Sequence, residues 1–423
     1  MGSIIKVILL SIVYIFIAYH FFTKVLYPTF FPQEQDLVND FACFYTASKF
    51  VLAGELPYRS TDNYKWTILK RAEAQSWQMN KNEVPAYIYP SLLAVTLTPL
   101  AHLPFPEARS IWAVILLFLF IGSIILTFWL LEKKPEWDGM TLLLFLIFLT
   151  STSTMENFTL GHVNILLLFL LLLTLYSYQR GNSLLSGAML AVATMLKSHP
   201  IVLILFFIWK KDVRAIASFI AVCILIFGLM QWAAPGADLF YAKNVVPAVS
   251  TKAPELNDKS LTICWRYLFT KNDVTPAITE SPMLSKTLSF TTNLAVIVVA
   301  YLSLRRAKMR GLMNDKKESL LVFALALVCM LLVQPYFEIH HIIFAFLALG
   351  CIFKFYVEEH FNWKNITLLA ILFLLLNSRG ENSFEKIGHV WYSAFLSNPQ
   401  IYGMLIVFSL MLIIINGKIL KRL

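Results

Sequence analysis

Basic and polar side chains interrupt one long apolar run, and they are the first candidates for chemistry. The run 184–209 contains Lys197-Ser198-His199-Pro200, so Lys197 and His199 fall where a membrane-spanning segment is expected. Ionisable groups inside such segments are costly, and they usually serve function or face an aqueous cavity. An ammonium group can bind a phosphate as a point charge. We therefore favour a functional role over the alternative in which Lys197 snorkels to the membrane interface.

Asp40 is the second candidate, because it begins a stretch that predicts a helix. Gly54 and Pro57 predict where that helix ends. The residues that recur at helical spacing are Phe41, Phe44, Tyr45, Lys49 and Leu52. We expect the helix to lie on the outer membrane surface, with aromatic side chains at headgroup depth. Aspartate is a good helix N-cap, but Asp40 could also be a general base, since its second carboxylate oxygen stays available.

Three shorter polar stretches add candidates, and each also has a plain structural explanation. The candidate side chains are Tyr89, His162, Asn164 and Arg266. The stretch YIYP at 87–90 suits an aromatic belt and the start of a helix. The stretch GHVN at 161–164 suits a turn and a cap. The stretch DKSL at 258–261, which precedes Arg266, suits a solvated loop.

The pair His340-His341 follows Glu338-Ile339 at the start of an apolar run. Adjacent side chains on a helix point about 100° apart, so we expect the two rings to diverge and not to share a metal. Zinc would also need further ligands, which the sequence does not offer. We therefore predict no metal site, and we expect the histidines to donate hydrogen bonds to a phosphate.

Cysteine usage gives no metal or redox motif. The chain has five cysteines and no CxxC pair, so a structural zinc or iron–sulfur site is not expected. Cys43 and Cys264 both fall in predicted outer loops, where a single disulfide is possible.

The composition shows what kind of chain must position these residues. Of 423 residues, 58% are apolar and 14% are charged, against about 45–50% and about 25% in soluble domains. A soluble protein of this size could not bury so much apolar surface, and such a chain is not disordered. The net charge of +10 comes from basic residues at the ends of apolar runs. That placement indicates membrane orientation and not a nucleic-acid partner.

The apolar runs predict an all-α polytopic membrane protein with about twelve transmembrane helices, each near the ~20 residues a bilayer needs. The predicted spans are about 5–30, 87–103, 108–132, 140–156, 163–178, 184–209, 213–233, 286–304, 318–335, 339–356, 365–378 and 400–417. Basic residues place both termini and residues 305–317 in the cytoplasm. The outer loops are then 32–85, 234–285, 335–341 and 379–399.

We treat residues 1–423 as a single membrane-embedded domain without internal repeats. The run 184–209 is taken as one helix, because two half-helices broken at His199-Pro200 would give an odd number of spans. The polar candidates then gather at the outer ends of spans, beside basic groups. This pattern suits a lipid-phosphate substrate that approaches from the outer leaflet.

With these motifs in order, the chain resembles glycosyltransferase family 87 from about residue 36 to residue 350. The family's DFxxFYxA…G…PY stretch is similar to Asp40, Phe41, Phe44, Tyr45, Ala47, Gly54, Pro57 and Tyr58. Its YPP stretch resembles Tyr89-Pro90 with Ser91 as the departure, and its GQxN stretch resembles 161–164 with His162 in place of glutamine. The glycine-to-lysine stretch resembles Gly187, Lys197 and Pro200. The last two stretches are loosely kept in 258–266 and in Pro335, His340 and His341.

The resemblance implies a GT-C fold and an inverting, metal-independent sugar transfer at the extracytoplasmic side of the cell membrane. The donor would be a polyprenyl-monophosphate hexose, most simply mannose, and the acceptor a cell-envelope glycan or glycolipid. No cofactor is expected beyond this lipid-linked co-substrate, and membrane lipids are the other partners. Two other classes stay open, namely a transporter of lipids or lipid-linked glycans and a ligase that uses a polyprenyl-diphosphate glycan.

These expectations assign a role to each candidate. Asp40 would be the base that deprotonates the acceptor hydroxyl. Positive or hydrogen-bonding groups would hold the donor phosphate, and these are Lys197, Arg266, His340 and His341. The remaining candidates would contact substrate, and these are Tyr45, Tyr89, His162, Asn164 and His199.

Overall fold

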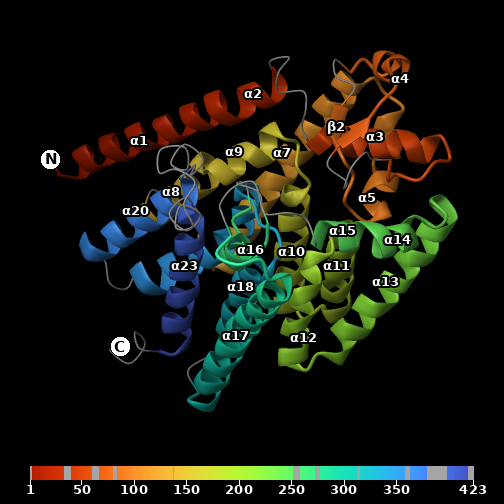
Figure 1. Cartoon of the computed structure of the whole chain (residues 1–423). Coiled ribbons are helices and arrows are strands. Elements are labelled where there is room, and N and C mark those ends of the chain that lie inside the picture. The colour runs from red at the N-terminus through yellow and green to blue at the C-terminus, as the bar shows by residue number, and fades with distance from the viewer. Residues whose placement is uncertain are drawn as a thin grey trace. The chain divides into compact units, whose positions relative to one another are not determined.

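Helices make up most of the described chain (Figure 1). The chain divides into two compact units. The computed structural model describes residues 2–32, 40–59, 66–79, 83–136, 138–250, 258–271, 277–311, 315–357, 363–378 and 398–417. Unit 1 comprises the chain up to Leu126 and Thr154–Lys252, and unit 2 comprises Thr127–Ser153 and Ala253–Leu423. Most of the predicted outer loop 379–399 lies outside the described residues.

Unit 1 contains the N-terminal helices and a small sheet. Its elements are α1 (Gly2–Phe21), η1 (Phe22–Leu26), α2 (Tyr27–Phe30), α3 (Asp40–Leu52), β1 (Trp66–Ile68), α4 (Arg71–Ser76), β2 (Glu83–Pro85), α5 (Ser91–Thr96), α6 (Thr98–Ala101) and most of α7 (Phe105–Leu130). After the segment given to unit 2 come most of α9 (Thr152–Thr159), α10 (Asn164–Gln179), α11 (Ser183–Leu196), η3 (His199–Leu203), α12 (Ile204–Lys210), α13 (Val213–Ala233), α14 (Ala237–Phe240), η4 (Tyr241–Val245) and α15 (Val246–Ser250). The strands pair antiparallel with Thr67 opposite Val84, a sheet that the sequence did not predict.

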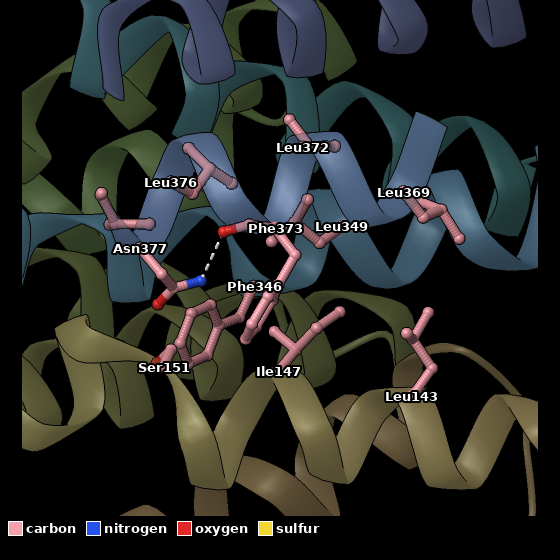
Figure 2. A pocket seen from close by; sticks show the side chains of 11 residues that line it. Leu143, Ile147, Ser151, Phe346, Leu349, Leu369, Leu372, Phe373, Leu376 and Asn377 are labelled. Atoms are coloured by element: carbon pink, nitrogen blue, oxygen red, sulfur yellow. Dashed lines mark hydrogen bonds between the residues drawn. The ribbon is translucent and has the colours of Figure 1, made fainter. Parts of the chain in front are cut away.

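Unit 2 contains helices and connecting segments but no strand among its described residues. Its elements are α8 (Gly139–Thr150), α16 (Ile263–Phe269), α17 (Pro282–Met309), α18 (Asp315–Val333), η5 (Ile339–Ala345), α19 (Phe346–Ile352), η6 (Phe353–Val357), α20 (Trp363–Asn377) and α23 (Pro399–Ile415). Figure 2 shows the side chains around a cavity lined mainly by α8, α19 and α20. The volume of this cavity is about 30 Å³. Leucine, isoleucine and phenylalanine side chains form nearly all of its wall, so it is a packing gap and not a site for a polar substrate.

The structure contains several helices long and apolar enough to cross a membrane, as an all-α membrane protein requires. Among the described residues these are Leu10–Phe30, Phe105–Leu130, Val213–Ala233, Pro282–Met309 and Ile339–Tyr356. The helices at 141–150 and 152–159, bent by 43°, would make a sixth if they form one span. Five shorter apolar helices accompany them. The figure of twelve spans stays a prediction.

The predicted continuous helix over 184–209 is wrong. Helix α11 ends at Leu196, Lys197 is extended with φ −154° and ψ 127°, and η3 begins at His199. Pro200 explains the break, because proline cannot donate to a helical hydrogen bond and disfavours the helical conformation of the residue before it. The alternative of two half-helices is the one that the structure adopts, with its break at Lys197.

The predicted span over 87–103 is also wrong as a single helix. Pro90 precedes the short helix α5, and Leu97 separates α5 from α6, whose second residue is Pro99. Proline suits the first turn of a helix but not its interior. The region therefore forms two short helices, and Tyr87 and Tyr89 in the segment before them are buried.

Helix α3 confirms the predicted helix after Asp40, and Gly54 has the left-handed φ of 74° expected beyond a helix end. The expectation that its aromatic side chains lie at headgroup depth is wrong. Nine of its residues are buried in the protein, including Phe41, Phe44 and Phe50. Apolar side chains that could face lipid instead pack against protein. All five cysteines are free, so the considered disulfide between Cys43 and Cys264 is not formed.

Helix α11 packs closely against α13 and forms a hairpin with α10, and this arrangement brings Lys197 near the start of α10. Helices α10, α11 and α13 lie side by side (Figure 1). A Cβ atom at Gly187 would fall 2.1 Å from the backbone oxygen of Ala215, so only glycine permits this approach. Because α10 and α11 form a hairpin, the end of α11 returns to the level at which α10 begins.

Candidate functional site

Asp40 and His162 meet in unit 1, at the centre of a group of polar side chains. We call Asp40, Tyr89, His162, Asn164 and Lys197 the Asp40 cluster. The Oδ2 atom of Asp40 lies 3.6 Å from Nε2 of His162, and the hydroxyl of Tyr89 lies 3.2 Å from the same nitrogen. The His162 side chain is 2% exposed, whereas that of Asp40 is 24% exposed. Asp40 is thus held from inside the protein and can still be reached from outside it.

The hydrogen bonds of His162 determine which ring nitrogen carries the proton. The backbone N–H of Asn164 donates to Nδ1 of His162 at 3.1 Å. Nδ1 must therefore offer a lone pair, which assigns the proton to Nε2. The Nε2–H group then points at the Tyr89 hydroxyl and the Asp40 carboxylate. His162 acts here as a neutral hydrogen-bond donor.

A glycine turn places His162 against α3. Gly161 has φ 66°, and a Cβ atom there would fall 2.8 Å from Cβ of Phe41. Its carbonyl accepts a hydrogen bond from the Trp112 indole at 2.8 Å. The backbone N–H of Phe41 donates to Leu160 O at 3.1 Å, which ties the start of α3 to this turn. Glycine permits both the left-handed backbone and the close approach.

Lys197 completes the cluster from the end of α11. Its Nζ donates to Oδ1 of Asn164 at 3.1 Å and lies 5.4 Å from the centroid of the Tyr89 ring. A cation at a helix C-terminus is favoured by the helix dipole, and one over an aromatic face gains further stabilisation. The ammonium group is thus fixed between two other predicted site residues.

Helix α14 anchors the segment that carries Tyr89. Oδ1 of Asp238 accepts hydrogen bonds from the backbone N–H of Ser91 at 3.0 Å and from the Ser91 hydroxyl at 2.7 Å. The Tyr58 hydroxyl donates to Tyr89 O at 2.9 Å, and its ring stacks on Phe240. Asp238 could not be predicted as a partner of Ser91, because the two residues are 147 positions apart in the chain. Only its place in a largely apolar region could have drawn attention to it.

Two further candidates of unit 1 lie beside the cluster with other contacts. Tyr45 is 1% exposed and its hydroxyl donates to Leu103 O at 2.8 Å. Burial raises the pKa of Tyr45 to about 12. This geometry supports a packing role, and substrate contact by Tyr45 stays a prediction. His199 begins η3, two residues after Lys197.

Arg266 belongs to unit 2, where a buried carboxylate holds it. Its Nη1 donates to Oδ2 of Asp258 at 2.9 Å and to Pro335 O at 3.1 Å. Oδ1 of Asp258 accepts backbone hydrogen bonds from Ser260 at 2.8 Å and Phe337 at 3.2 Å. Burial raises the pKa of Asp258, although the Arg266 guanidinium opposes that shift. Asp258 thus joins the start of α16 to the segment before the two histidines.

Glu338 brings His340 and His341 together, and the expectation that their rings diverge is wrong. The ring centroids are 4.3 Å apart. Nδ1 of His340 lies 3.2 Å from the Glu338 carboxylate, and Nδ1 of His341 accepts the Glu338 backbone N–H at 3.1 Å. The Tyr336 hydroxyl donates to the same carboxylate. Both rings are held by one residue, which the sequence signalled only as an acid two positions before the pair.

The predicted site residues therefore form two groups, one in each unit. Asp40, Tyr89, His162, Asn164 and Lys197 contact one another in unit 1. Arg266, His340 and His341 lie in unit 2 on neighbouring segments joined through Asp258. In the described part of the chain, no three His, Cys, Asp or Glu side chains are grouped so that they could hold a metal ion. A metal-independent reaction stays a prediction.

Comparison with known protein families gives a match over the middle of the chain. The model of glycosyltransferase family 87 matches residues 87–335, more than half of the 423-residue chain. The chain belongs to glycosyltransferase family 87. With its apolar helices, this membership makes it a membrane glycosyltransferase. No curated protein matches the chain.

The region matched to glycosyltransferase family 87 contains only part of the two groups. It includes Tyr89, His162, Asn164, Lys197 and Arg266. Asp40, which precedes the matched region, is tied to it through His162 at 3.6 Å. His340 and His341 follow it by a few residues and are tied to it through the Asp258–Phe337 hydrogen bond next to Glu338. The family assignment and the contacts therefore support different members of each group.

Proposed function

We propose that this glycosyltransferase moves a hexose, with mannose as the first candidate, from a polyprenyl-monophosphate donor to an extracytoplasmic glycan or glycolipid. The transfer inverts the anomeric centre, and the GT-C fold is part of the same proposal. The observation that carries it is the Asp40 carboxylate, partly exposed and held beside the Nε2–H of buried His162. A carboxylate fixed in this way suits a general base.

The proposed reaction is a single displacement. The Asp40 carboxylate removes the proton from an acceptor hydroxyl as that oxygen attacks the anomeric carbon. The bond between the anomeric carbon and the phosphate oxygen breaks, and polyprenyl phosphate leaves as an anion. One displacement inverts the centre, so a single carboxylate suffices, with the acceptor in the place that water takes in an inverting hydrolase.

Fixed positive charge near the leaving phosphate would stabilise the transition state. In unit 1 the group suited to this is Lys197, which Asn164 and the Tyr89 ring hold in place. In unit 2 the positive charge suited to this is Arg266, and the two histidines could donate hydrogen bonds to a phosphate. Each of them is oriented by a carboxylate or a backbone group. We propose each of these side chains as a candidate for binding the donor phosphate.

The variant Asp40→Asn tests the role of the base, because asparagine keeps the shape and removes the basicity. Purified protein would be incubated with polyprenyl-phosphate-[14C]mannose and a membrane glycolipid extract. We expect transfer to fall at least ~10²-fold, the lower range for loss of general-base help. Glu83→Gln, which neutralises an exposed acid of strand β2, is the matched control and should leave transfer unchanged. Transfer by Asp40→Asn near the unsubstituted rate would remove Asp40 as the base.

The donor arm of the same assay separates the alternatives. A polyprenyl-diphosphate glycan that is consumed while the monophosphate sugar is not would indicate the ligase. Movement of labelled lipid across proteoliposome membranes without any new glycosidic bond would indicate the transporter. In that case Asp40→Asn would have no bond-forming step to impair.

A further inference from the structure

A basic cavity lies between the C-terminal ends of α17 and α23 in unit 2. Its volume is about 300 Å³, and its wall is formed by Ser303, Arg306, Arg310, Leu412, Ile413 and Asn416. The first three residues belong to the end of α17 and the rest to the end of α23. No part of the site described above touches it.

The two arginine side chains of this cavity have no partner among the described residues. In the part of the chain that the structure describes, neither the Arg306 nor the Arg310 side chain has a hydrogen bond or ion pair. Their neighbour Lys308, by contrast, forms an ion pair, with its Nζ 3.6 Å from Oε1 of Glu318. Arg306 and Arg310 are four residues apart on one helix face, where like charges repel. An anion between them would remove that repulsion.

The opposite wall of the cavity is suited to a lipid chain. Leu412 and Ile413 are half-buried apolar residues. Helix α17 is long and apolar enough to cross a membrane, and α23 is a shorter apolar helix. The basic residues at the end of α17 and those expected after α23 predict the same, cytoplasmic side for both helix ends. Their meeting at one cavity agrees with that prediction. Basic pockets between membrane helices on the cytoplasmic side suit anionic lipid headgroups.

We propose that the α17–α23 cavity binds the phosphate headgroup of an anionic membrane lipid. Arg306 and Arg310 hold the phosphate through charge-assisted hydrogen bonds, and Leu412 and Ile413 contact the first carbons of the chain. Two guanidinium charges outweigh the partial negative charge of two helix C-termini. The phosphate can come from an anionic phospholipid or from a polyprenyl phosphate. The inference is independent of the proposed sugar transfer.

Native mass spectrometry of the full-length protein in a neutral detergent tests the site. The probes are dioctanoyl phosphatidylglycerol, dioctanoyl phosphatidylcholine and farnesyl phosphate. We expect the two anionic probes to bind and the zwitterionic one not to bind. Tighter binding of farnesyl phosphate would identify the polyprenyl carrier as the source, and tighter binding of phosphatidylglycerol would identify a phospholipid. Equal binding of phosphatidylcholine would overturn the proposal.

Four variants separate a built site from general charge attraction. Arg306→Gln and Arg310→Gln should each weaken binding about tenfold, as loss of a charged hydrogen bond predicts. Arg305→Gln removes the same charge outside the cavity wall and should change binding less than about threefold. Ser303→Phe fills the cavity and keeps both arginines, so it should abolish binding. Equal effects of Arg305→Gln and Arg306→Gln, or full binding by Ser303→Phe, would show that no defined site exists.

Discussion

The two polar groups of this glycosyltransferase use the same device on their histidines and place their carboxylates very differently. In unit 1 the N–H of Asn164 holds Nδ1 of His162, and in unit 2 the N–H of Glu338 holds Nδ1 of His341. Each ring is thereby fixed with its Nε2 as the donor. The Asp40 side chain is 24% exposed, whereas that of Asp258 is completely buried against Arg266.

This difference separates a carboxylate available for chemistry from one engaged in holding the fold. Oδ1 of Asp258 accepts two backbone hydrogen bonds, and Oδ2 accepts one from Arg266. Its side chain is completely buried, so a substrate hydroxyl cannot reach it. Asp40 lies at the start of α3, where the helix dipole favours its negative charge. It is also reachable from outside the protein, as a base must be.

The comparison predicts its largest effect on stability at Asp258. Removing one partner of a buried ion pair leaves the other charge unpaired, which costs roughly 3–5 kcal/mol. Because Arg266 is 16% exposed, we expect Asp258→Asn to lower the free energy of unfolding by about 3 kcal/mol. Asp40→Asn should change it by less than about 1 kcal/mol, because asparagine keeps the shape of this partly exposed side chain and loses only the interaction of its charge with the helix dipole. Thermal unfolding of both variants in detergent measures the contrast. A stable Asp258→Asn protein that no longer binds donor would reverse the two roles.

Local features of this fold could be predicted from sequence, because neighbours in the chain determine them. The helix after Asp40 and its end at Gly54 follow from spacing and from glycine chemistry. The family resemblance likewise brought out Asp40, His162 and Lys197. The sequence also permits two half-helices broken at His199-Pro200, and only the even number of spans favours one helix; the structure breaks two residues earlier, at Lys197.

Contacts between distant segments could not be predicted in this way. Asp238 and Ser91 are 147 residues apart, and nothing local marks them as partners. The aromatic side chains of α3 are predicted to lie at headgroup depth, but they are buried in the protein. Sequence cannot separate the two cases, because the same aromatic residues suit contact with lipid and contact with protein. The two histidines were expected to diverge because helical geometry ignores Glu338, which holds both rings.

A smaller effect is expected at the anchor of Tyr89, where Asp238 holds Ser91. Ser91 is the first residue of α5, a position that suits proline, and Pro90 has the ψ of 157° that a following proline requires. Asp238→Ala leaves the Ser91 N–H without its acceptor, and Ser91→Pro leaves the buried Asp238 without its donors. Each should cost roughly 1–3 kcal/mol, the usual penalty for an unsatisfied buried group.

The double variant Asp238→Ala/Ser91→Pro removes both unsatisfied groups together. We expect it to be at least about 1 kcal/mol more stable than the sum of the single changes predicts. Asp238→Asn is the matched control, because its amide oxygen can accept both hydrogen bonds and should restore stability. Thermal unfolding of the four variants measures this coupling. Strictly additive losses would mean that Asp238 does not act through Ser91.

The smallest effect is expected from replacing His162 by glutamine, and it tests the role of the fixed ring most directly. Glutamine can donate a hydrogen bond from its amide nitrogen, as His162 does from Nε2, whereas leucine fills a similar volume without a donor. If His162 orients the Asp40 carboxylate, His162→Gln should keep kcat within about threefold of the unsubstituted protein. His162→Leu should lower kcat about tenfold, as loss of one hydrogen bond to a charged group predicts. Both variants keep Asp40 and Lys197, so donor affinity should change little. His162→Leu leaves the buried Asn164 N–H without its acceptor and should lower the free energy of unfolding by roughly 1–3 kcal/mol, so kcat is compared per folded protein. A large fall in kcat for both variants would mean that the imidazole does something that a simple donor cannot, and His162 would then join Asp40 as a reacting group.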